Sequence, residues 1–179
     1  MWAKILDMEH EEMNTDFINK IMDCISEYKL TVNEKQINEK IEKLKKEGLE
    51  PYRNKAIYKT LLSVIDLTTL NTADNATRIK AFTNKVNYFK TNFPELDNVA
   101  AICTWPALLS SAKDNLTDTN VKICSVAGGF PSSQTFPEVK IAETSLALME
   151  GADEIDIVIN VGDLLEGNYD KVFDDISEV

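Results

Sequence analysis

The segment DEIDIVIN (153–160) places acidic side chains inside a run that otherwise predicts a buried strand. Successive strand residues point to opposite faces, so Ile155 and Ile157 share one face while Asp156 lies on the other. A strand of a parallel sheet is normally buried on both sides, and a carboxylate there needs a partner or a chemical task. Asp156 is therefore a candidate for proton transfer, with a structural ion pair at the strand end as the alternative.

Further polar or flexible groups fall near the carboxyl ends of the predicted strands. They are Asp66 and Thr68 at the end of the first strand, Cys103 at the end of the second, the GGFP turn (128–131) after the third, and Asn160 on the face of Asp156 in the fourth. Ligands of α/β folds collect at the carboxyl ends of parallel strands. The sequence therefore predicts a ligand site at that rim.

The cysteines favour a pocket-lining role over covalent or metal chemistry. A Cys–His nucleophile has little support, because His10 is the only histidine in the chain. Cys24, Cys103 and Cys124 have no CxxC spacing, so neither a zinc site nor a disulfide framework is expected. Most free cysteines are small buried hydrophobes, and we expect Cys103 to line the pocket.

Alternating strands and helices must position these groups from about residue 62 onward. Strands are predicted at 61–67, 98–104, 121–127 and 153–161. Helices are predicted at about 52–61, at about 73–90, from Pro106, from the Thr135–Glu138 capping spacing to Gly151, and from Tyr169 onward. Successive β-α units predict a parallel sheet with right-handed crossovers. Half of a (β/α)8 barrel and a doubly wound open sheet both fit, but TTLNTADN after the first strand lacks the glycine-rich turn of dinucleotide-binding sheets.

The first fifty residues differ in composition, being rich in Glu, Lys, Asn and Ile. Two amphipathic helices are predicted there, at about 12–29 and 32–47, the second opening on a Thr31–Glu34 capping spacing and ending near Gly48. The expected organisation is a helical N-terminal extension over 1–50 and a β/α part over 51–179. The extension is either a lid packed on the main domain or an appendage that binds a partner.

The charge balance limits the partners. Nineteen Lys and Arg against 30 Asp and Glu give a net charge of -11, which argues against nucleic acid and against an anionic membrane surface. A small anionic substrate is compatible with a local cluster of donors. The N-terminus has no apolar signal region and no run approaches about 18 apolar residues, so a cytoplasmic chain with reduced thiols is expected.

Several motifs together resemble deoxyribose-phosphate aldolase, over about residues 52–179. They are IDLTTLN (65–71), AAICTWP (100–106), the GGFP turn, KIAETSLALMEGADEIDIVINVG (140–162) and LLEGNYDKVFDDI (164–176). The resemblance implies an α/β fold of the (β/α)8 TIM-barrel family, with about four β-α units present here as a half-barrel, preceded by the α-helical hairpin. It implies reversible cleavage of 2-deoxy-D-ribose 5-phosphate to D-glyceraldehyde 3-phosphate and acetaldehyde through a lysine Schiff base, without metal or organic cofactor.

The resemblance also implies roles for single residues. Asp156 matches the family's proton-relay aspartate, which works with a second lysine and an ordered water. Asp66 and Thr68 match the motif at the rim of the first strand. Leu70 is similar to a residue beside the substrate, and Cys103 matches a cysteine near the pocket.

The resemblance places the Schiff-base lysine on the sixth strand of the barrel and its helper on the seventh. Lys122 and Lys140 do not fall at the matching motif, so we expect the 179-residue chain alone to be inactive. In the complete enzyme the expected partners are a small phosphorylated sugar and further copies of the chain. The alternative function is a non-catalytic half-barrel that acts by self-association or by pairing with another half, and a different open-sheet enzyme is the third reading.

Overall fold

The computed structural model describes residues 33–179, and the chain divides into two compact units, Met1–Pro51 and Tyr52–Val179. The helix predicted over 12–29 lies outside the described residues. No described helix combines the length and the apolar composition that crossing a membrane requires.

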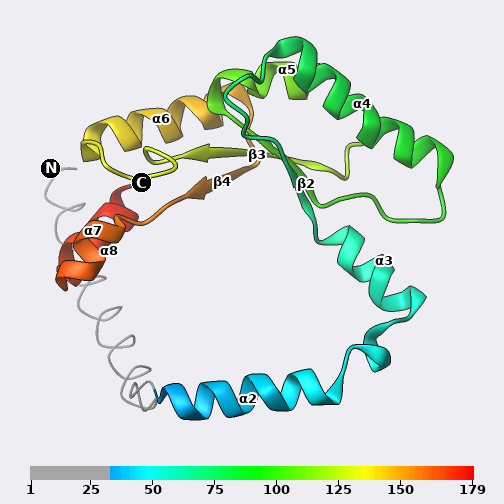
Figure 1. Ribbon diagram of the computed structural model, residues 1–179. Helices are drawn as coiled ribbons and strands as arrows, with labels where there is room; N and C mark the ends of the chain where they lie inside the picture. The colour runs from blue at the N-terminus through cyan, green and yellow to red at the C-terminus, as the bar shows by residue number, and fades with distance from the viewer. Residues whose placement is uncertain (1–32) are drawn as a thin grey trace, which may run out of the picture. The chain divides into compact units, whose positions relative to one another are not determined.

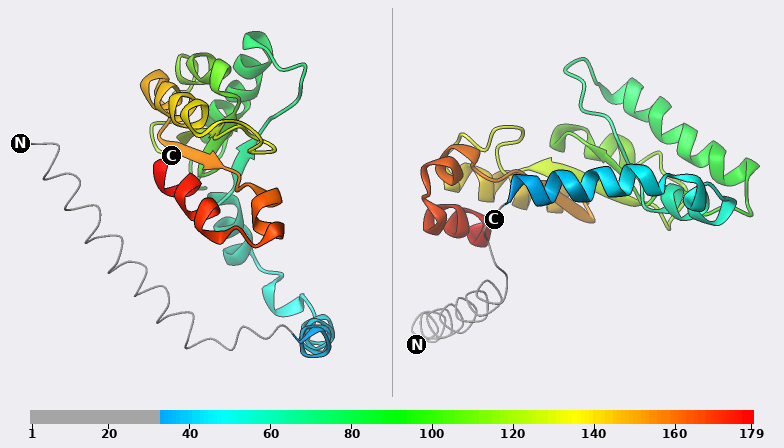
Figure 2. Two further views of the ribbon diagram at one scale, coloured as in Figure 1. Left: turned by 90° about the vertical axis from the view of Figure 1, so that its left-hand side faces the viewer. Right: turned by 60° about the horizontal axis from the view of Figure 1, so that its bottom comes forward.

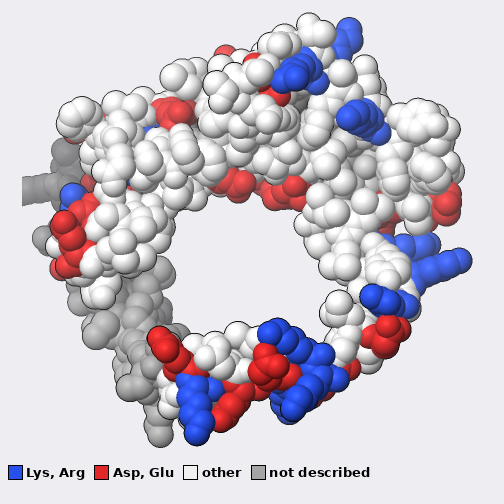
Figure 3. All heavy atoms as spheres, in the orientation of Figure 1, with Lys and Arg blue, Asp and Glu red and all other residues white. Residues whose placement is uncertain are grey.

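Helix α2 (Glu34–Glu47) is the described helix of the first unit. Its N-cap is Asn33, whose side chain accepts a hydrogen bond from the Gln36 backbone at 3.2 Å, so the predicted cap at Thr31 is wrong. Gly48 ends the helix with a φ of 73°, as predicted. None of its residues is buried, and acidic and basic side chains are interspersed along it (Figure 3).

The second unit begins with the helix predicted over about 52–61, which extends into the run predicted as a strand. After the short η1 helix (Glu50–Tyr52), α3 spans Lys55–Ser63 and β1 only Asp66–Thr68. Asn54 caps α3 by accepting from the Ile57 backbone at 3.1 Å. The leucines of the LLSVIDL run therefore complete an amphipathic helix, and the strand predicted over 61–67 is wrong in its first half.

Four parallel strands form the sheet, in the order β1-β2-β3-β4, which confirms the predicted α/β class. The remaining strands are β2 (Ala101–Thr104), β3 (Lys122–Ala127) and β4 (Glu154–Ile157). In the register, Thr68 pairs with Cys103 and Cys103 with Cys124. β4 is shorter than the predicted strand over 153–161, because the chain turns after Ile157 into a further helix.

The helices of this unit lie mainly on one side of the sheet (Figure 1, Figure 2). They are α4 (Ala76–Asn92), η2 (Pro106–Leu108), α5 (Leu109–Lys113), α6 (Pro137–Glu150), α7 (Val161–Glu166) and α8 (Tyr169–Glu178). α4, α5 and α6 cover that side, while α7 and α8 follow β4 and lie side by side. The N-cap of α6 is Phe136 with Pro137 in the first turn, so the cap predicted at Thr135 is wrong.

Buried side chains occupy both faces of the sheet. The helix-covered face holds two clusters, formed by Val86, Val99, Ile102 and Val121 and by Leu109, Ile123 and Ala147. The opposite face holds Ala101, Cys103, Cys124 and Val126, with Leu70, Trp105 and Phe130 packed against them. We call this opposite face the site face, because the polar side chains predicted to do chemistry lie on it.

Candidate functional site

Asp156 lies on the site face of β4. Its neighbour Ile155 packs with Leu109 and Ile123 on the helix-covered face, so Asp156 points away from the helices, as their alternation predicts. The Asp156 side chain is exposed rather than buried, although it belongs to a strand of a parallel sheet. Its carboxylate is therefore open to solvent and to a bound molecule.

Two buried cysteines lie beside this carboxylate. The Cys103 thiol donates a hydrogen bond to Asp156 Oδ2 over 3.6 Å, and Cys124 is the register partner of Cys103 on the next strand. The two thiol sulfurs and a carboxylate oxygen of Asp156 all lie within 4.8 Å of one another. β2 and β4 are separated by β3, which carries Cys124, so the contact between Cys103 and Asp156 crosses one strand.

Both thiols are held in the neutral form. Burial raises the pKa of Cys103 above its ordinary value, and the negative charge of Asp156 raises it further. Burial is also the largest cause that raises the pKa of Cys124, and the interaction with Cys103 raises this pKa further. Cys103 is thus a hydrogen-bond donor rather than a thiolate nucleophile, which fits a pocket-lining residue.

Asp66 and Thr68 share the site face of β1. They pair in register with Ala101 and Cys103, whose side chains belong to the same face. Thr68 lies level with Cys103, but Asp66 begins the strand and lies about 7 Å further from the carboxyl end. The structure therefore brings Thr68 next to the thiols and places Asp66 lower on the same face.

An apolar wall packs against the thiols at the carboxyl end of the sheet. Leu70, Trp105 and Phe130 contact the cluster around Cys103, and the Trp105 and Phe130 rings meet edge to face with centroids 6.2 Å apart. The Trp105 indole donates to the Asn71 carbonyl over 3.3 Å. The sequence analysis missed both aromatic residues, although each follows a predicted strand within a motif that it used.

Asn160 has a structural task that the sequence analysis did not foresee. β4 ends at Ile157, so Asn160 is not on the strand with Asp156. It is instead the N-cap of α7, and its Oδ1 accepts from the Asp163 backbone at 3.3 Å and from Gln134 Nε2 at 3.1 Å. The prediction that Asn160 shares a strand face with Asp156 is therefore wrong, because a cap begins a new helix there.

Three lysines near the sheet are candidate sources of the Schiff-base amine, and they are engaged elsewhere or lie lower on the sheet. The Lys140 amine is buried, 2.7 Å from both Ser133 Oγ and Asp175 Oδ1. Lys171 pairs with Asp163 at 2.9 Å. Lys122 is exposed at the start of β3, two residues before Cys124. Within residues 33–179, no ion pair joins a lysine to Asp156.

The exposed charges of the site face are mainly negative. Alternation along the strands places Asp66, Glu154 and Asp156 on this face, against one lysine, Lys122. Acidic atoms accordingly gather along the side of this unit opposite the helices (Figure 3). These side chains do not attract a phosphate group, so donors for a phosphorylated ligand must come from other residues.

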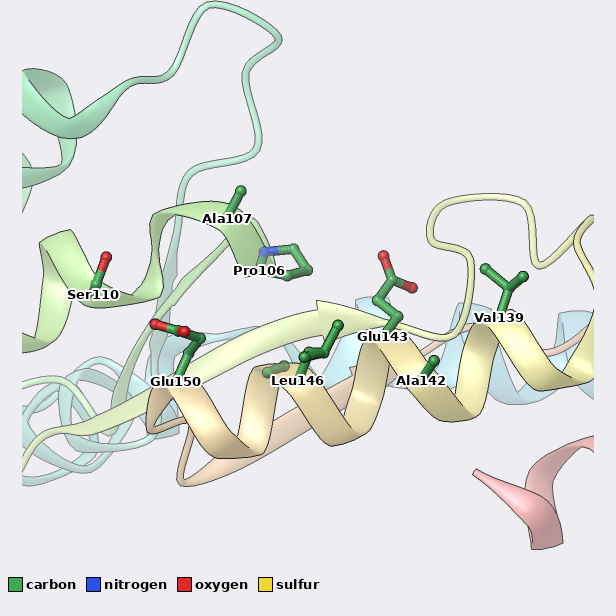
Figure 4. A pocket seen from close by; sticks show the side chains of 9 residues that line it. Pro106, Ala107, Ser110, Val139, Ala142, Glu143, Leu146 and Glu150 are labelled. Carbon is green, nitrogen blue, oxygen red and sulfur yellow. The ribbon is translucent and has the colours of Figure 1, made fainter.

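A separate groove of about 580 Å³ lies on the helix-covered side, between α6 and the η2–α5 segment (Figure 4). Its lining is mostly apolar, and includes Pro106, Ala107, Val139, Ala142 and Leu146. The acidic residue Glu143 there accepts a hydrogen bond from the Gly129 backbone at 2.9 Å. The groove is on the other side of the sheet from Asp156, and it brings together no acid–base pair.

The chain is similar to known aldolases over part of its length, although no protein-family model matches it. A deoxyribose-phosphate aldolase from Streptococcus suis is 48% identical over 80 residues, which cover 45% of this chain and 36% of that protein. A Caenorhabditis elegans protein provisionally named deoxyribose-phosphate aldolase is 35% identical over 127 residues, which cover 69% of this chain and 41% of that protein.

Solved structures agree with these relatives. The crystal structure of a provisionally assigned deoxyribose-phosphate aldolase from Coccidioides immitis superposes with a TM-score of 0.59 at 27% identity, covering 67% of this chain and 44% of that one. The predicted resemblance and the TIM-barrel type of fold are thereby confirmed for part of the chain. The chain spans less than half the length of the relatives it matches.

Proposed function

We propose that residues 52–179 form the amino-terminal half of a deoxyribose-phosphate aldolase barrel. The complete protein would reversibly cleave 2-deoxy-D-ribose 5-phosphate to D-glyceraldehyde 3-phosphate and acetaldehyde through a lysine Schiff base. The observation that carries this proposal is the exposed Asp156 carboxylate, held beside Cys103 on the site face of a sheet similar to that of aldolases.

Asp156 is the proton-transfer group of this proposal. When the bond between the second and third sugar carbons breaks, its electrons pass to the iminium nitrogen and the hydroxyl on the third carbon loses its proton. The resulting enamine then takes a proton at carbon before acetaldehyde leaves. An exposed carboxylate can relay these protons through water, and the neutral Cys103 thiol fixes one of its oxygens by a hydrogen bond.

Asp66, Thr68, Leu70 and Cys103 are the proposed pocket residues. Thr68 and Cys103 lie level in the register, and Leu70 packs against the same cluster. We propose that Asn160 lies at the edge of the pocket, because its side chain caps α7. The substrate is a small phosphorylated sugar, and the free thiols Cys103 and Cys124 suit the reducing cytoplasm that we propose as its location.

The Schiff-base amine comes, in this proposal, from a lysine outside these 179 residues. Lys140 and Lys171 are both held in ion pairs, which supports this view. The phosphate donors likewise come from outside, since the site face carries mainly carboxylates. The chain alone would then be inactive, and borohydride reduction with the substrate should leave its mass unchanged.

A single-chain chimera tests the proposal. The full 179-residue chain is joined to the carboxyl-terminal half of the Streptococcus suis aldolase, which supplies the Schiff-base lysine that the proposal requires. We expect cleavage of 2-deoxyribose 5-phosphate, and a borohydride-trapped adduct on a lysine of the appended half. A chimera that melts cooperatively yet forms no adduct would overturn the proposal. A stoichiometric adduct on the chain alone would show that the amine lies within it.

A second candidate function is a non-catalytic half-barrel that associates with itself or with another half. β1 and β4 form the two edges of the sheet, and unpaired edge strands offer backbone donors and acceptors to another chain. Sedimentation of the chain at micromolar concentration tests this candidate. A homo-oligomer that dissociates when Asp66 or Glu154, whose backbone N–H groups face away from the sheet, is replaced by proline supports edge pairing, whereas a compact monomer excludes self-association.

A further inference from the structure

Three potential metal ligands converge on the site face. The sulfurs of Cys103 and Cys124 and one carboxylate oxygen of Asp156 lie within 4.8 Å of one another. They come from three adjacent strands, β2, β3 and β4, so the sheet itself fixes their spacing. Two thiols and a carboxylate form a donor set that soft and borderline cations prefer.

The spacing fits a tetrahedral cation. With a metal–sulfur bond of about 2.3 Å and a metal–oxygen bond of about 2.0 Å, a tetrahedral angle separates sulfur and oxygen by about 3.5 Å. The observed distance from Cys103 Sγ to Asp156 Oδ2 is 3.6 Å. A cation could therefore replace the thiol proton between these atoms with little movement of β2 or β4.

The surroundings also fit a bound cation. Asp156 is exposed and offers a way in from solvent, while Cys103 and Cys124 are buried beneath it. Leu70, Trp105 and Phe130 shield the sulfurs from water, which strengthens their bonds to a cation. Glu154 lies level with Cys124 in the register and adds negative charge to the same face.

We propose that Cys103, Cys124 and Asp156 bind a thiophilic divalent cation, such as Zn²⁺ or Cd²⁺, and leave its fourth position open to solvent. Binding forms two metal–sulfur bonds and one metal–oxygen bond, and each thiol releases its proton to solvent. The proposal revises the expectation from cysteine spacing, because the two sulfurs meet through strand register and not through a local CxxC motif.

Such a cation would oppose the proposed aldolase reaction. The metal–oxygen bond uses the carboxylate that the proposed function assigns to proton transfer, so one molecule cannot do both at once. This consequence rests on the proposed function, whereas the binding site itself does not. A metal titration of the chain without substrate tests the cation site alone. Its failure would leave the proposed function untouched, and failure of the chimera would leave the cation site untouched.

Titration of the reduced chain with Cd²⁺ tests the site, with a phosphine in place of a thiol reductant. We expect the ultraviolet charge-transfer band of cadmium thiolate to saturate at one equivalent, with two protons released per cation. Cys103→Ser and Cys124→Ser should each reduce the band and weaken binding by about 10-fold or more. Asp156→Asn should retain the band but bind more weakly.

Cys24→Ser is the matched control, because Cys24 is the remaining cysteine of the chain. It should leave the band and the stoichiometry unchanged, and excess Mg²⁺ should not displace Cd²⁺. A band that survives Cys103→Ser and Cys124→Ser but disappears in Cys24→Ser would overturn the site. So would a titration of the cooperatively folded chain that never saturates.

Discussion

Cys103 and Asp156 lie 53 positions apart in the sequence, yet the thiol of one donates to the carboxylate of the other over 3.6 Å. The contact crosses β3, which lies between their two strands. The contact links Asp156, which we propose as the proton-transfer group, with Cys103, which lies beneath it. The orientation of the Asp156 carboxylate is therefore coupled to the packing of the buried thiols.

The first prediction concerns Asp156 in the active chimera. Asp156→Asn removes the proton-transfer group but keeps the shape of the side chain, so kcat should fall by roughly 100-fold or more. Steady-state kinetics measure it. Glu154→Gln is the matched control, because Glu154 is an exposed carboxylate of the same strand without an assigned role, and its kcat should stay close to the parent value. Equal kcat values for parent and Asp156→Asn would remove the role assigned to Asp156.

The second prediction concerns the buried ion pair between α6 and α8. Lys140→Met leaves Asp175 without its cation and Ser133 without its donor, so the free energy of unfolding should fall by about 3–5 kcal/mol. Urea unfolding of the chain measures it. Lys80→Met, at an exposed position of α4, should change it by no more than about 0.5 kcal/mol. Similar losses of unfolding free energy in both variants would show that the Lys140–Asp175 pair contributes no more to stability than an exposed lysine does.

The third prediction concerns the pH dependence of the Asp163–Lys171 pair. A hydrogen bond from Lys171 lowers the pKa of Asp163, and the same bond raises the pKa of Lys171. The Asp163 contribution is therefore present above its unfolded pKa, about 3.9, and is lost as the pH falls through the lower folded pKa. The Lys171 contribution is complete below its unfolded pKa, about 10.4, and is lost as the pH rises through the higher folded pKa.

Urea midpoints of the parent and of Lys171→Met, compared across pH, test this dependence. Their difference should be constant between about pH 5 and pH 9 and should shrink on either side. Lys80→Met should show no such profile. A difference that grows towards low pH would contradict the direction of the Asp163 pKa shift.

The fourth prediction separates two roles of Asn160. As the N-cap of α7 it accepts the Asp163 backbone hydrogen bond, so Asn160→Ala should lower the free energy of unfolding by about 1 kcal/mol. Asn160→Ser retains a capping oxygen and should recover most of that loss. A rise of KM in the chimera with unchanged stability would instead favour a direct role in the pocket.

Periodicity was enough to predict the succession of strands and helices, but it could not locate their ends. In LLSVIDL the apolar residues suit a buried strand and the last turns of a helix equally, and α3 runs to Ser63 before β1 begins at Asp66. In DEIDIVINV the run continues past Ile157, but the cap at Asn160 begins α7. A side-chain cap therefore accounts for the second of these boundaries and not for the first.

The candidate site was predictable where it depends on alternation within one strand. The side on which Asp156 lies follows from its neighbours in β4. The contact with Cys103 depends on the register of three strands, which alternation within each single strand does not locate. Cys124 was not predicted as a site residue for the same reason. Within its own strand it is an ordinary buried residue, and only the register of β2 and β3 places it beside Cys103.

Trp105 gives the site face an optical reporter of its own. The chain has two tryptophans, Trp2 and Trp105, so Trp2→Phe leaves a single indole. That indole packs against the thiol cluster and holds the Asn71 carbonyl. Its fluorescence intensity and emission maximum should therefore respond to whatever occupies the space beside Cys103, and occupancy could be followed in real time without labelling the protein.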